Sequence, residues 1–225
     1  YWELKNRLDS ASPDEIQAFL SRYAGTYQED RLRNDWLLLL GKQRDWATFG
    51  QVYPKFRMRD DKSVTCYALL ADASQGRGAP NVGQQVRDLW LAQKDADDGC
   101  TTAAGQMYAS KLITEADVWR RARIATENNR QSAARAAVAI VAPESADQVA
   151  QVFASPAKYL AGQSKVRGRE RKELALLALI RMAASDPDAA RALVASGLDP
   201  NWTLEQQQVM TCIRELLAHG VAPTR

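Results

Sequence analysis

The sequence predicts an all-α fold, arranged as an irregular right-handed superhelix (a solenoid) of stacked helical hairpins. Three observations predict it: helix-starting signals recur along the chain, apolar residues recur at helical spacing, and no segment alternates apolar and polar residues. The one Asp-Gly pair, Asp98-Gly99, has no alternating runs beside it that would make a β-hairpin.

The helix starts are capping patterns. Ser12-Pro13-Asp14-Glu15 combines a capping serine, a proline at the first helical position and a glutamate that reaches back. Similar patterns stand at Asn81–Gln84, Thr114–Asp117, Ser145–Gln148 and Thr203–Gln206, and Asp186-Pro187 opens a further helix that Gly197 is expected to end.

Two later segments show how the helices bury their apolar residues. Val209, Cys212, Ile213, Leu216 and Leu217 form one helical stripe. Leu174–Ala184 is apolar almost all round, which predicts a helix enclosed by neighbours.

The helices pair into hairpins. In Arg31–Pro54, one helix ends in the run Leu37–Leu40, Gly41–Asp45 turns the chain, and Trp46, Phe49 and Val52 begin the return helix. Further hairpins are predicted at 67–74 with 81–93, 101–111 with 114–126, 131–141 with 145–153, and 170–184 with 187–194. Their return helices start at 46, 81, 114, 145 and 186, at steps of 35, 33, 31 and 41 residues, an irregular solenoid period. A plain helical bundle is the alternative.

Composition excludes several classes of protein. The chain has 30 Lys+Arg against 27 Asp+Glu, a formal charge of +3, which does not suggest a nucleic-acid binder. It has no run of about 18 apolar residues, so no transmembrane segment is expected. Because it opens at Tyr1 without a methionine, we expect residues 1–225 to be a single superhelical segment of a longer protein.

The cysteines and the single histidine predict no metal site and no cofactor. Cys66, Cys100 and Cys212 form no C-x-x-C pair, and His219 has no neighbouring ligand of the usual type. On composition alone, three buried thiols and one disulfide with a leftover thiol are both open.

Several segments resemble the opening and middle helices of the soluble lytic murein transglycosylases. They are Tyr1–Leu8, Phe19-Leu20, Arg31–Leu37, Arg44–Phe49, Asp88–Leu91, Gly99-Cys100, Leu112–Ile124 and Ala178–Ala183. Enzymes of that family carry a U-shaped helical superhelix before a lysozyme-like catalytic domain. They work in the periplasm and cut the MurNAc–GlcNAc bond of peptidoglycan to a 1,6-anhydro product. This chain resembles the superhelical part only.

The resemblance implies a non-catalytic scaffold whose partners are peptidoglycan strands and its own C-terminal catalytic domain, in the periplasm and without nucleic acid. The family's catalytic glutamate precedes a serine, with Gly-Leu-Met-Gln and Asn-Ala-Gly motifs further on. Here the only Glu-Ser is Glu144-Ser145, and neither companion motif is present. We therefore expect no catalytic residue in this chain.

The resemblance also predicts which cysteines form a disulfide. Cys66 and Cys100 stand at places similar to cysteines of the family, near the ends of two helices expected to run antiparallel. The resemblance thus predicts a Cys66–Cys100 disulfide, and Cys212 is expected to remain a buried thiol.

Two features are candidate contacts. The segment 165–172 concentrates five cations that could hold an anionic polymer such as peptidoglycan, or could form a solvated helix start: Lys165, Arg167, Arg169, Arg171 and Lys172. Four tryptophans could stack on sugars, but their helical positions favour packing between hairpins: Trp36, Trp46, Trp90 and Trp119.

Two other functions stay open from the sequence. One is a free-standing, TPR-like helical-repeat adaptor that binds a protein partner in its concave face. The other, less favoured, is nucleic-acid binding through residues 165–172, which would be strongly salt-dependent.

Overall fold

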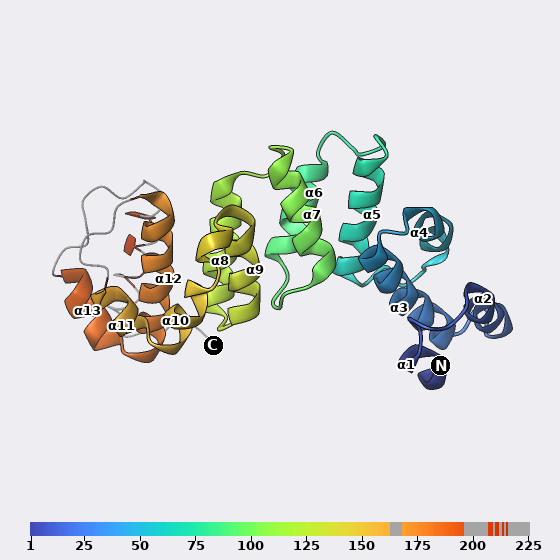
Figure 1. Cartoon of the computed structure of the whole chain (residues 1–225), viewed down its shortest axis with the longest axis horizontal. Coiled ribbons are helices and arrows are strands. Elements are labelled where there is room, and N and C mark those ends of the chain that lie inside the picture. Colours follow the sequence, from blue (N-terminus) through green and yellow to red (C-terminus); the bar gives the residue numbers. More distant parts are fainter. Residues whose placement is uncertain (163–167, 196–206, 209, 212, 214, 216–225) are drawn as a thin grey trace. The chain divides into compact units, whose positions relative to one another are not determined.

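The structure is a computed structural model that describes residues 1–162, 168–195 and, beyond these, 207, 208, 210, 211, 213 and 215. Helices joined by turns account for its regular structure, and the described residues contain no strand. The predicted all-α class of helical hairpins is confirmed (Figure 1).

The helices fall into two compact units, which are described separately. Unit 1 comprises residues 1–93 and 97–113, and unit 2 comprises residues 94–96 and 114–225. Unit 1 holds α1 (Trp2–Asn6), α2 (Pro13–Arg22), α3 (Tyr27–Gln43), α4 (Trp46–Val52), η1 (Tyr53–Lys55), α5 (Lys62–Ser74), α6 (Val82–Leu91) and α7 (Asp98–Ala109). Unit 2 holds α8 (Glu115–Glu127), α9 (Gln131–Val141), η2 (Pro143–Ser145), α10 (Gln148–Ala154), α11 (Pro156–Ala161), α12 (Arg169–Ser185) and α13 (Pro187–Ala195).

The hairpin of α3 and α4 has a tighter turn than expected. The sequence predicts a turn from Gly41, but α3 continues to Gln43 and the chain reverses at Arg44, whose φ of 63° is left-handed. Asp45 then caps α4 by accepting a hydrogen bond from the Thr48 amide at 3.0 Å. Gly41 therefore lies within α3, and its missing side chain leaves room for the buried Tyr67 ring.

In unit 1, α5, α6 and α7 pack side by side (Figure 1). α3 contacts both α5 and α7, and Val64, Tyr67 and Ala68 of α5 belong to the same hydrophobic core as the α3–α4 hairpin. The largest buried side chains of this core include Ile16, Leu32, Leu37, Phe49, Phe56 and Tyr67.

In unit 2, small residues let helices approach closely. α8 and α9 pack through fully buried alanines at 122, 125, 134 and 137. α12 contacts α8, α10, α11 and α13, and its residues from Leu174 to Ala183 are buried apart from Arg181. The prediction of an enclosed helix here is confirmed.

Several predicted helix starts carry the expected caps. The hydroxyl of Ser12 accepts a hydrogen bond from the Glu15 amide, and Asp186 accepts one from the Ala189 amide. Thr114 and Asp117 form a reciprocal capping box. The Thr203 start, the Gly197 stop and most of the stripe from 209 to 217 lie outside the described residues.

At two predicted helix starts, the structure differs from the prediction. α6 begins after Asn81 as expected, but the Asn81 side chain does not cap the helix and accepts a hydrogen bond from the Gln85 side chain instead. Ser145 does not cap α10, which begins at Gln148. Its hydroxyl lies in η2 and bonds the side chains of Glu170 and Gln148.

Candidate functional site

The basic segment 165–172 leads into α12. Lys165 and Arg167 lie outside the described residues, whereas Arg169, Arg171 and Lys172 stand in the first turn of the helix. Arg169 and Arg171 are exposed to solvent. The structure therefore brings three of the five predicted cations to one helix end.

These cations stand at the end of the helix that disfavours them. The amino end of a helix carries a partial positive charge, so each nearby cation costs about 0.3–1 kcal/mol there. Acidic partners offset part of this cost: Arg169 Nε lies 3.3 Å from Glu115 Oε1, and Glu170 is in the same turn. Their position is therefore not explained by helix stability.

Tyr159 of α11 is packed close to this helix end. Its phenol is buried, and this burial together with the Glu170 carboxylate raises its pKa, while Arg171 partly opposes the shift. The hydroxyl donates a hydrogen bond to Gln148 at 3.1 Å. Tyr159 is thus held as a neutral donor and does not reduce the positive charge of the segment.

The Glu144-Ser145 pair has the wrong surroundings for a glycosidase acid. Glu144 is exposed in the short helix η2, whereas a general acid needs apolar walls that keep it protonated. Ser145 is buried and engaged by Glu170 and Gln148.

Cys66 of α5 and Cys100 of α7 form a disulfide in the structure, with an S–S distance of 2.07 Å and a Cα–Cα distance of 4.9 Å. These are the two cysteines that the sequence paired. The side chain of Cys212 lies outside the described residues.

The four tryptophans are packing residues. Trp36, Trp90 and Trp119 are buried, and half-buried Trp46 packs edge-on against Phe49. Trp2, which the sequence did not single out, is 71% exposed.

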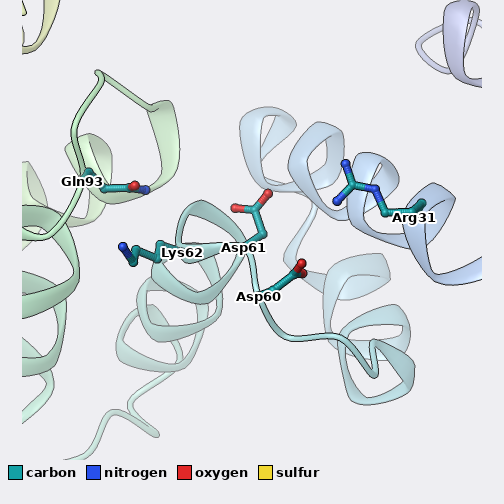
Figure 2. Close-up of a pocket in the computed structure, with 5 residues that line it drawn as sticks. All are labelled: Arg31, Asp60, Asp61, Lys62 and Gln93. Carbon is teal, nitrogen blue, oxygen red and sulfur yellow. The ribbon is translucent and has the colours of Figure 1, made fainter. Parts of the chain in front are cut away.

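Sequence reasoning missed a polar groove in unit 1. A pocket of about 300 Å³ is lined by Arg31, Asp60, Asp61, Lys62 and Gln93. Figure 2 shows the two aspartates in its middle, between Arg31 of α3 on one side and Lys62 with Gln93 on the other.

A second pocket adjoins the first, because both include Asp61 and Gln93. It measures about 400 Å³, and its other lining residues are Leu38, Lys42, Ser63, Tyr67, Asp97 and Asp98. We call the two together the Asp61 groove.

Helix caps fix the floor of the Asp61 groove. Asp61 caps α5 by accepting hydrogen bonds from the amides of Ser63 and Val64, at 2.8 and 3.2 Å, and its other oxygen accepts one from Asn34 at 3.1 Å. Asp97 caps α7 by accepting a 2.7 Å bond from the Cys100 amide. The sequence contains both caps, but only the fold shows that they face one groove.

Neither a metal site nor a membrane span is found in the described part of the chain. No three His, Cys, Asp or Glu side chains there are grouped to hold a metal ion. No described helix combines the length and the hydrophobicity needed to cross a bilayer.

No protein-family model and no curated protein sequence matches the chain. In fold, the chain is similar to solved structures of soluble lytic transglycosylases, which confirms the resemblance predicted from its sequence.

One of these is the lytic transglycosylase Slt of Pseudomonas aeruginosa, solved as an inactive mutant, with 27% identity, a TM-score of 0.54, and coverage of 96% of this chain. Another is Slt70 of Escherichia coli, with 15% identity, a TM-score of 0.57 and 94% coverage. A third is the 70-kDa soluble lytic transglycosylase in complex with bulgecin A, with 15% identity, a TM-score of 0.56 and 95% coverage. The chain spans 35% to 38% of the length of these proteins.

Proposed function

We propose that the chain is a non-catalytic superhelical scaffold segment of a longer, periplasmic lytic transglycosylase. The observation that carries the proposal is the similarity to the Pseudomonas enzyme, with 27% identity over 96% of the chain. The chemistry would belong to a separate C-terminal lysozyme-like domain that cleaves the MurNAc–GlcNAc bond of peptidoglycan to 1,6-anhydro products.

The environment of Glu144 supports a non-catalytic role. A transglycosylase of this kind needs one carboxylic acid that first protonates the leaving oxygen and then acts as a base. Glu144 is exposed to water and follows a proline in a short 3₁₀ helix, so it lacks the apolar walls that such an acid needs.

A direct assay tests this part of the proposal. The purified chain, incubated with murein sacculi, is expected to release no anhydromuropeptides, and Glu144→Gln should behave like the unmodified chain. Release of these products by the chain, and their loss in Glu144→Gln, would require withdrawing the scaffold assignment.

The basic turn of α12 supports a contact with an anionic polymer, and the peptide carboxylates of peptidoglycan provide such charges. Arg169 and Arg171 are exposed at a helix end that disfavours cations. The segment would steer glycan strands by charge, so binding should weaken as salt is raised.

Co-sedimentation with sacculi tests the contact. We expect the Arg169→Gln/Arg171→Gln variant to bind less than the unmodified chain. Arg120→Gln/Arg135→Gln, which removes two exposed charges of α8 and α9, should bind as the unmodified chain does. Equal losses in both variants would point to net charge alone and would overturn a specific role for this turn.

A further inference from the structure

A chain of three hydrogen bonds in unit 2 ends at a carboxylate. The Tyr159 hydroxyl donates to Gln148 Oε1 at 3.1 Å, and Gln148 Nε2 donates to Ser145 Oγ at 3.0 Å. The hydroxyl of Ser145, which is buried, donates in turn to Glu170 Oε1. Every donor in this chain points toward Glu170, and hydrogen bonds aligned in this way polarise and strengthen one another. The chain therefore holds the Glu170 carboxylate against η2 and α10.

Glu170 lies within the basic turn of α12, whose cations are Arg169, Arg171 and Lys172, and it is the acidic residue of that turn. Successive residues of an α-helix are about 100° apart around its axis. Arg169 and Arg171 therefore leave the helix on either side of Glu170. The position of one carboxylate decides how much of their charge is exposed to a partner.

The two arginines differ in their partners. Arg169 Nε already lies 3.3 Å from Glu115 Oε1 of α8, whereas Arg171 is exposed and forms no ion pair with the described residues. Glu170 and Arg171 act on the same phenol: burial chiefly raises the pKa of Tyr159, Glu170 raises it further, and Arg171 lowers it. Arg171 is thus the cation that Glu170 would neutralise if its side chain were released.

A pair of neighbouring residues in α6 shows that such neutralisation is sterically possible. Arg87 Nη2 lies 3.1 Å from Oδ1 of Asp88, the next residue in the helix. A glutamate side chain is one methylene longer than an aspartate, so a released Glu170 could reach Arg171 in the same way. The hydrogen bond from Ser145 instead draws this carboxylate toward η2.

We propose that Ser145 is a positioning residue for the polymer contact: its hydroxyl holds the Glu170 carboxylate toward η2 and leaves the positive charge of Arg171 available to an anionic polymer. The inference rests on the proposed contact between the basic turn of α12 and peptidoglycan. Ser145 acts through Glu170 and does not touch the polymer itself.

Co-sedimentation of the whole chain with murein sacculi tests the role of Ser145. Ser145→Ala should weaken binding by about twofold to fivefold although it leaves the net charge unchanged, because the released Glu170 would pair with Arg171. Ser132→Ala removes an exposed hydroxyl from the start of α9 and should leave binding unchanged. Unchanged far-UV circular dichroism would show that both variants fold.

A double-mutant cycle separates positioning from a general structural role. Glu170→Gln removes the negative charge and keeps an oxygen that can accept from Ser145, so it should not weaken binding. Added to Glu170→Gln, Ser145→Ala should have no further effect, because the released side chain is then neutral. If Ser145 only maintained the local structure, its loss would weaken binding in both backgrounds.

The proposal is overturned if Ser145→Ala binds sacculi as well as the unmodified chain does. It is equally overturned if Ser145→Ala loses the same affinity with and without Glu170→Gln. Failure of the polymer contact itself looks different: Arg169→Gln/Arg171→Gln would then keep full binding, and the role of Ser145 would fall with it. If that arginine variant loses binding while the cycle shows no coupling, only the role of Ser145 is rejected.

Discussion

Gly41 shows how one missing side chain sets the spacing of two helices. A Cβ atom at this position would lie 2.3 Å from Cδ2 of Tyr67, whose ring is buried. We expect Gly41→Ala to lower the free energy of unfolding by about 1–3 kcal/mol, because α3 and α5 would have to separate. Urea denaturation measures the change.

Gly50 provides the matched control. It lies within α4, and a Cβ atom there would meet nothing within 4 Å. Gly50→Ala should therefore raise stability by about 0.5–1 kcal/mol, the usual gain of alanine over glycine in a helix. If both substitutions had the same sign, the contact with Tyr67 would not be the cause.

The shifted pKa of Glu29 predicts how the stability of the protein depends on pH. Burial alone would raise its pKa, but hydrogen bonds from Arg33 and from the Gly25 amide, with the charge of Arg57, outweigh burial and lower it. A carboxyl whose pKa is lower in the folded state stabilises the fold above its unfolded pKa. That contribution is lost as pH falls through the folded pKa.

The expected outcome is a pH-dependent difference between Glu29→Gln and the unmodified chain. At neutral pH the variant should be less stable, and the difference should shrink as pH falls below about 4, where the carboxyl of the unmodified chain becomes protonated. Urea midpoints measured from pH 7 to pH 3 test this. A difference that stayed constant over this range would rule out the ionised Glu29 as its source.

Single-residue roles were predictable where the chemistry is local. Ser12 and Thr114 cap the helices that directly follow them, so spacing in the sequence was sufficient. The sequence did not predict the role of Gly41, because its reason is Tyr67, a residue of another helix 26 positions later.

At the scale of elements, the capping box at the start of α8 is expected to contribute measurably to the stability of the protein. The Asp117 amide donates to Thr114 Oγ1 at 3.2 Å, and the Thr114 amide donates back to Asp117 Oδ2 at 3.0 Å. Thr114→Ala removes the first bond and should destabilise the protein by about 1 kcal/mol. Asn81→Ala, at a helix start without a side-chain cap, should cost less than about 0.5 kcal/mol. Equal losses would contradict the importance of the cap.

The predicted helix boundary was wrong where a residue distant in the sequence binds the side chain that was expected to cap the helix. The hydroxyl of Ser145 is the right type for a cap, but it bonds Glu170 of α12, 25 residues away. α11 was not predicted at all, since six residues are too few for a helical pattern to show in the sequence.

At the scale of the whole molecule, the disulfide is the largest single constraint on the unfolded chain. Cys66 and Cys100 are 34 residues apart, and closing such a loop stabilises a fold by about 3–4 kcal/mol in the chain-entropy model. Reduction should therefore lower the denaturation midpoint of unit 1. Hydrogen exchange should show reduced protection in α5, α6 and α7.

Two variants separate this effect from other actions of the reductant. Cys66→Ala/Cys100→Ala should already have the lower midpoint and should not respond to reductant. Cys212→Ala should respond as the unmodified chain does. Peptide mapping without reductant that found Cys66 free, or joined to Cys212, would contradict the pairing.

The sequence predicted the order of the hairpins and the family they resemble, because both depend on patterns that run along the chain. It did not predict the Asp61 groove, whose walls come from α3, α5 and α7. Such a site becomes visible only when helices from distant parts of the sequence have packed together.

The sulfur bridge also makes the segment between its two cysteines a closed covalent ring. The ring contains α6 and the exposed loop at 75–81, with Arg77 in the middle of that loop. Cutting the backbone after Arg77 would open the ring without dividing the molecule, since the two fragments stay joined through sulfur. New chain ends, or an inserted sequence, could therefore be introduced at this loop while the disulfide still joins α5 to α7.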